Sequence, residues 1–147
     1  DDDVRIAGYY HDIIWMPGAL DLEERSAEYA DRQLHEYRLP QEFRDTVYRL
    51  ILATKHNGLR PADWKEAAIR DADLWTLGTD DWNKFEETQQ QIRWEFRHVP
   101  DEVYNSNRLA MFKKMFPIQI FWTWTGAARE QQARNNLRRV GIDLGNA

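Results

Sequence analysis

Histidines and neighbouring carboxylates are the residues of this chain whose types and spacing could do chemistry. The four histidines are His11, His35, His56 and His98. His11 is followed directly by Asp12, and an imidazole beside a carboxylate suits a divalent ion such as Mn²⁺, Fe²⁺, Zn²⁺ or Mg²⁺. An ordinary polar pair on a helix is the alternative interpretation of this dipeptide.

Two further groups stand out downstream. Asp71 and Asp73 flank Ala72 inside an expected helix, and Asp is a poor residue for a helix interior, which favours a functional role. Two solvated carboxylates are the alternative. Lys55 and His56 stand together at the end of another expected helix, where the helix dipole favours cations and is a sufficient explanation by itself.

Helical periodicity of apolar residues indicates which elements position these groups. Turn residues and capping residues then predict where each helix begins and ends. The expected helices are one that carries Val4 to Ile14 and stops before Pro17-Gly18, one from Asp21 to near Leu39, one from Pro40 to Asn57-Gly58, one from Asp63 to Gly78, one capped by Asp80 or Asp81, one starting at Pro100-Asp101 and one from Gly126 onward. The sequence therefore predicts an all-α, single-domain bundle of about six or seven helices over residues 1–147.

Composition limits what such a bundle could do. The 147 residues are 42% hydrophobic and include no cysteine, so a metal could be held only by His and carboxylates. The net charge of −5 argues against nucleic acid as a partner. No apolar run reaches the roughly 18 residues that a membrane span needs, so no membrane partner is expected. These features predict a cytoplasmic protein, or one of an organelle matrix if a targeting segment has been removed.

Several blocks occur in a fixed order along the chain. They are YYHDIIW at 9–15, DLEERSA at 21–27, ILATKH at 51–56, DADLWTLG at 71–78, FRHVP at 96–100, Arg108, and ARNNL at 133–137. Together they resemble the metal-dependent phosphohydrolases of the HD superfamily, and the resemblance covers nearly the whole chain. It implies an all-helical domain with one divalent metal, acting on a small phosphate ester or a nucleotide.

The resemblance also implies roles for particular residues. His11 and Asp12 match the family's metal-binding pair, and Asp73 matches its distal metal ligand. Asp71 would accept hydrogen bonds or assist a water molecule. Lys55 and His56 would stabilise the charge of the phosphate.

The sequence departs from the family pattern in two places. The family has an earlier metal-binding His on an upstream helix, and we expect that helix to be missing before Asp1. Leu22 replaces an Asn that is common in the family. A non-catalytic HD-like domain, acting as a structural or protein-interaction subunit, is therefore the alternative function. Glu23 and Glu24 are candidates for general acid or base, although carboxylates at a helix start are the simpler interpretation.

The most apolar stretch of the chain runs from Phe116 to Trp124. Core packing is the favoured explanation for its aromatic and branched side chains. Any exposed part of the Phe116-Trp124 region is the place where a homo-oligomer or a larger assembly is expected to form.

Overall fold

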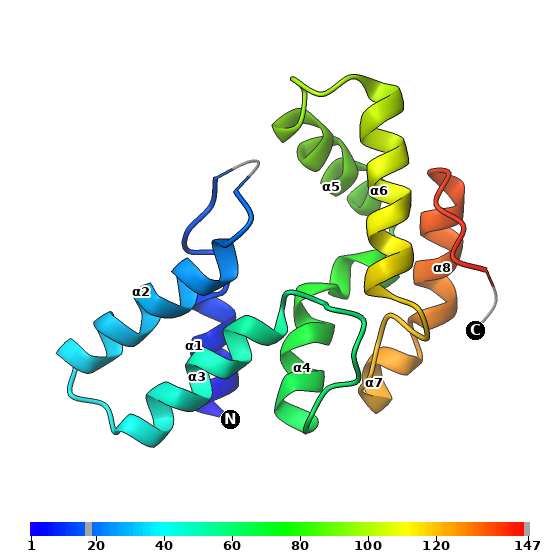
Figure 1. Cartoon of the computed structure of the whole chain (residues 1–147). Helices are drawn as coiled ribbons and strands as arrows, with labels where there is room; N and C mark the ends of the chain where they lie inside the picture. The colour runs from blue at the N-terminus through cyan, green and yellow to red at the C-terminus, as the bar shows by residue number, and fades with distance from the viewer. Residues whose placement is uncertain (17–18, 146–147) are drawn as a thin grey trace. The chain divides into compact units, whose positions relative to one another are not determined.

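A computed structural model of the chain describes residues 1–16 and 19–145, and in these residues helices are the only regular secondary structure, with no strand. The predicted all-α fold class is confirmed (Figure 1). Within the described residues no helix is long and apolar enough to cross a membrane. The helices are α1 (Asp2–Tyr10), α2 (Leu22–Glu36), α3 (Gln41–Ala53), α4 (Trp64–Asp73), the 3₁₀ helix η1 (Trp75–Gly78), α5 (Trp82–Glu95), α6 (Asp101–Met115), α7 (Trp124–Ala127) and α8 (Glu130–Arg139).

The helices form two compact units, each with its own core. The first unit contains Asp1–His56 and Pro61–Asp73, and the second contains Asn57–Arg60 and the chain from Leu74 onward. The expectation of one domain over residues 1–147 stays a prediction.

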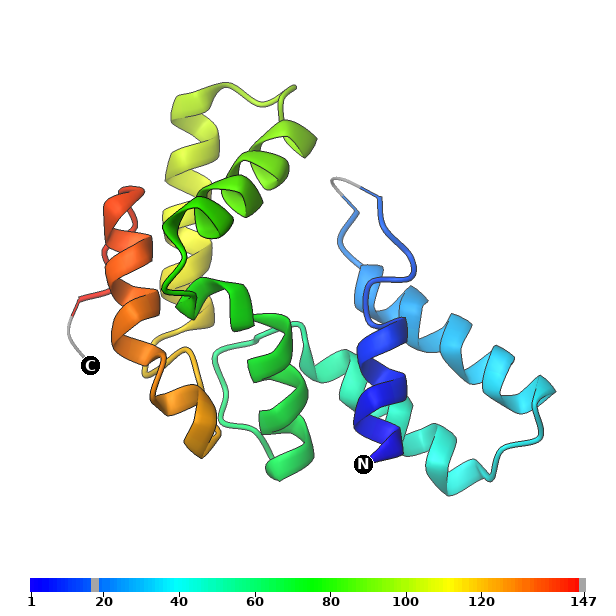
Figure 2. The ribbon, with the colours of Figure 1, turned by 180° about the vertical axis from the view of Figure 1, so that it is seen from behind.

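The core of the first unit lies where helices α1 to α4 meet. Helices α2 and α3 run antiparallel, and both α1 and α4 pack on α3 (Figures 1 and 2). Small residues on α1 and α2 allow this close packing, since Ala7, Ala27 and Ala30 are fully buried. The buried residues of this core are Ala7, Ala27, Ala30, Leu34, Val47, Leu50, Ile51 and Ile69.

Helix α1 is shorter than the sequence predicts. It ends at Tyr10, with His11 as its C-cap, instead of continuing past Ile14. The backbone N–H of Ile14 donates to Oγ of the buried Ser26 on α2 (3.2 Å), so it is not available for a helical bond. The chain after His11 therefore contacts α2 instead of extending the helix, and the expected stop at Pro17-Gly18 lies outside the described residues.

The second unit surrounds Phe85, Phe121 and Leu137, which are fully buried. Asn136 on α8 ties the unit together, because its amide donates to the carbonyls of Leu77 (2.9 Å) and Thr79 (2.7 Å). The other buried residues of this core are Leu77, Phe112, Phe116, Ile120, Ala133 and Ile142.

The Phe116-Trp124 region contributes both core and surface to this unit. Phe116, Ile120 and Phe121 are buried, which confirms the packing interpretation for them. Ile118 is 44% exposed and Trp124 is 92% exposed. An assembly through these two side chains stays a prediction.

Three predicted helix boundaries have a local explanation. The carboxylate of Asp63 accepts from the N–H of Glu66 (2.9 Å) and caps α4, and that of Asp81 accepts from Lys84 (3.2 Å) and caps α5. Gly58 follows α3 with a φ of 80°, and a Cβ there would lie 2.7 Å from the carbonyl oxygen of Lys114. A glycine is therefore required at this turn.

Candidate metal centre

Three side chains of the first unit bring their ligand atoms together. One atom each from His11, Asp12 and Asp73 lies within 4.8 Å of the other two. Nε2 of His11 is 3.2 Å from Oδ2 of Asp12 and 3.3 Å from Oδ1 of Asp73. These are the three residues that the sequence singled out for a metal, and the donor set of one imidazole and two carboxylates fits a divalent ion.

His11 is held in one orientation by the helix that it ends. Its Nδ1 lies 2.8 Å from the carbonyl oxygen of Gly8, one turn earlier in α1, and that carbonyl can only accept a hydrogen bond. Nδ1 therefore carries a proton, which leaves Nε2 as the atom directed at the two carboxylates. Histidines that bind metals in proteins are commonly anchored in this way through their other ring nitrogen.

Asp73 is the last residue of α4, and both of its carboxylate oxygens have a histidine beside them. Oδ1 faces His11, and Oδ2 lies 2.7 Å from Nε2 of His56. His56 is only 3% exposed, and it adopts a φ of 46°, an uncommon value for a residue with a side chain. The turn after α3 thus brings the imidazole of His56 to the carboxylate of Asp73.

The charges in this cluster stabilise one another. Hydrogen bonds with Asp12 and Asp73 raise the pKa of His11 from 6.5 to about 10. Burial favours a higher pKa for Asp73, but the hydrogen bonds from His11 and His56 outweigh it and lower that pKa to about 2. Without a metal, His11 is a cation between two anions, so a metal ion would have to displace its proton.

The other residues predicted for the site, Lys55, Asp71 and Glu23, are not among the three converging ligands. The ammonium of Lys55 forms an ion pair with Glu24 on α2, and the hydrogen bond between them raises the pKa of Lys55. Asp71 is buried, at 2% exposure, and is not one of the three grouped ligands. Glu23 is half-buried in the first turn of α2.

Sequence reasoning missed two contacts of the site. The bond from His56 to Asp73 joins residues seventeen positions apart, so no local pattern could reveal it. The anchor of His11 on Gly8 had a weak signal, because residues three apart share a helix face.

Comparison with known proteins adds no assignment to this geometry. Neither the known protein families, nor the curated proteins, nor the solved structures include a significant match to the chain. The candidate site is therefore described by its own residues alone.

Proposed function

We propose that this chain is a metal-dependent phosphohydrolase that acts on a small phosphate ester or a nucleotide. The observation that carries the proposal is the convergence of His11, Asp12 and Asp73, with Nδ1 of His11 anchored on a backbone carbonyl. The ordered blocks that resemble the HD superfamily support the same function.

In this proposal His11, Asp12 and Asp73 hold one divalent ion and leave other coordination positions to solvent and substrate. When bound, such an ion polarises a phosphoryl oxygen and lowers the pKa of water toward about 7, which supplies hydroxide near neutral pH. Asp12 is suited to the open side of the site, since its side chain is 65% exposed. Asp73 is suited to the inner side, at 24% exposure.

Lys55 supplies positive charge for the phosphate in this proposal. Its side chain is 38% exposed, and Glu24 stabilises its protonated form. His56 acts through Asp73 rather than on the substrate, because it is buried and directed at that carboxylate. Asp71 is given no step, since it lies outside the group of ligands.

Metal binding is the first test. Calorimetric titration of the metal-free protein with Mn²⁺ should show one binding site per chain. Asp73→Asn and Asp12→Asn should each weaken binding by at least about tenfold, whereas Glu28→Gln, which changes an exposed carboxylate on α2, should not. Equal affinity in all four proteins would refute the site.

Turnover is the second test and separates the two functions considered for the chain. Hydrolysis of p-nitrophenyl phosphate and of nucleoside monophosphates should require added Mn²⁺ and be lost in Asp73→Asn. Binding of Mn²⁺ at the site without hydrolysis of any of these esters would refute the hydrolase and favour the non-catalytic helical domain.

A further inference from the structure

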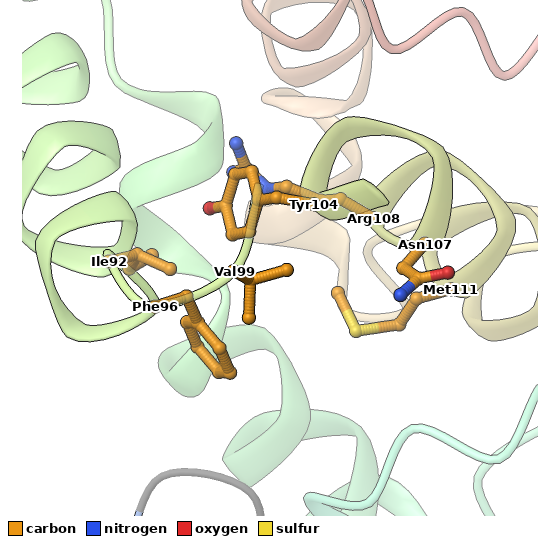
Figure 3. Close-up of a pocket in the computed structure, with 7 residues that line it drawn as sticks. All are labelled: Ile92, Phe96, Val99, Tyr104, Asn107, Arg108 and Met111. Atoms are coloured by element: carbon orange, nitrogen blue, oxygen red, sulfur yellow. The ribbon is translucent and has the colours of Figure 1, made fainter. Parts of the chain in front are cut away.

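The second unit contains a pocket that is independent of the proposed metal centre. It has a volume of about 350 Å³ and lies between α5 and α6 (Figure 3). This volume is within the range of about 300–1,000 Å³ that is usual for small-molecule sites. Apolar side chains make up most of the lining, which consists of Ile92, Phe96, Val99, Tyr104, Asn107, Arg108 and Met111.

Arg108 is an unusual residue for such an apolar lining. Its guanidinium is partly buried, and burial lowers its pKa. Its hydrogen-bond acceptor is the neutral amide oxygen of Gln89, and no carboxylate of the described chain forms an ion pair with it. A partly buried cation without an anion is costly, so an anion from outside the chain would be stabilising here.

Tyr104 supplies a second unmatched polar group one helical turn before Arg108. Tyr104 is only 8% exposed, and its hydroxyl has no hydrogen-bond partner among the described residues. The guanidinium of Arg108 lies 5.8 Å from the centre of the Tyr104 ring, and Figure 3 shows the two side chains together. A buried hydroxyl of this kind is expected to find an acceptor.

We propose that this pocket binds a small monocarboxylate with an apolar body. The carboxylate would lie at the end formed by Arg108 and Tyr104, where a planar guanidinium and a phenol can both donate to it. The apolar body, an aromatic ring or a medium-length alkyl chain, would contact Ile92, Phe96 and Met111. One cation and one hydroxyl match a single negative charge better than the double charge of a phosphate monoester.

Naphthoate and its uncharged analogue naphthamide provide the test, with the full chain and isothermal titration calorimetry. Naphthoate should bind at one site, and naphthamide should bind at least about tenfold more weakly, since a hydrogen bond to a charged group contributes that much affinity. Inorganic phosphate should not compete. Equal binding of the two naphthalene compounds, no binding of either, or displacement by phosphate would overturn the proposal.

Three variants assign the binding to this pocket. Arg108→Met should weaken naphthoate about tenfold and leave naphthamide unchanged, and Tyr104→Phe should weaken naphthoate by a smaller factor. Lys113→Met removes a charge from an exposed position of α6 and should change the affinity for neither naphthoate nor naphthamide. Circular dichroism checks that each variant is folded. If Arg108→Met binds naphthoate like the wild type, the proposal is wrong.

A second copy of the chain is the competing occupant of the pocket. Sedimentation of the wild type and of Met111→Asp distinguishes a second copy of the chain from a small ligand. A dimer that Met111→Asp dissociates, together with absent naphthoate binding, would assign the pocket to self-association and overturn the proposal. If the wild type and Met111→Asp sediment alike, and naphthoate does not change the sedimentation of the wild type, the small ligand is supported as the occupant of the pocket.

Discussion

At the scale of single residues, the Asp73 carboxylate is the centre of the candidate site. One of its oxygens faces His11 and the other faces His56, so two imidazoles fix its plane. Only His11 belongs to the group of converging ligands, and the exposures of 20% for His11 and 3% for His56 agree with this division. We therefore expect His11 to contact a metal and His56 to orient its ligand.

His56→Asn tests this orienting role. Asn tolerates positive φ values, so the substitution keeps the backbone of the turn and removes the bond to Oδ2 of Asp73. We expect Mn²⁺ affinity to fall by roughly 10–100-fold, as for other groups that orient a metal ligand. The measurement is calorimetric titration, and His35→Asn on α2 is the control. Unchanged affinity in His56→Asn would contradict the role.

The charges at His11 predict how stability depends on pH when no metal is bound. The pKa of His11 is raised from 6.5 to about 10, so its contribution to stability is complete below pH 6.5 and is lost as the pH rises through about 10. The pKa of Asp73 is lowered from 3.8 to about 2, so its contribution is complete above pH 3.8 and is lost as the pH falls through about 2.

Urea unfolding with a chelator present measures this dependence. Wild type should exceed His11→Gln in free energy of unfolding near pH 6, and the difference should shrink steadily between about pH 7 and pH 10. Comparing the two proteins at each pH cancels the titration of Lys and Tyr elsewhere. A difference that stays constant over this range would show that His11 does not titrate as described.

At the scale of helices, local sequence signals predicted starts better than ends. Asp21, Asp63 and Asp81 each precede a helix as expected. The side chains of Asp63 and Asp81 accept from backbone N–H groups three positions away, so a local pattern could reveal them, whereas the side chain of Asp21 forms no capping bond. The segment after α1 instead contacts Ser26 of another helix, and periodicity within α1 does not reveal such a contact. The same limit applies to the site. The sequence predicted the residue types of its ligands, but it could not predict the contact between His56 and Asp73.

The start of α5 offers a matched test of the capping argument. The sequence left Asp80 and Asp81 as alternatives, and the carboxylate of Asp81 is the one that accepts from the N–H of Lys84. Asp81→Ala should lower the free energy of unfolding by about 1 kcal/mol. Asp80→Ala, which changes an adjacent exposed carboxylate, should have an effect within about 0.5 kcal/mol. Chemical denaturation checks both, and equal losses would contradict the assignment.

At the scale of the whole molecule, the two proposed activities fall in different compact units. His11, Asp12 and Asp73 all belong to the first unit, and every residue of the carboxylate pocket belongs to the second. Fold class was predictable because helical periodicity repeats along nearly the entire chain. The division into two units was not predictable from the sequence, since it depends on contacts between residues that are distant in sequence.

Metal binding should be detectable as stabilisation of the protein. A ligand that binds only the folded state, at a hundred times its dissociation constant, adds about 2.7 kcal/mol to the free energy of unfolding. Mn²⁺ should therefore raise the midpoint of thermal unfolding in a concentration-dependent way, and a chelator should reverse the change. Asp73→Asn should lose this response, whereas Glu28→Gln should keep it.

Hydrogen exchange can then locate the stabilised region. The three ligands lie at the end of α1 and at the last residue of α4, and His56, which orients Asp73, lies in the turn after α3. Amides of these three segments should exchange more slowly when Mn²⁺ is present, because opening any of them would release a ligand or the residue that orients it. Slower exchange confined to other helices, or an unchanged midpoint in wild type, would place any bound metal elsewhere and refute the centre at Asp73.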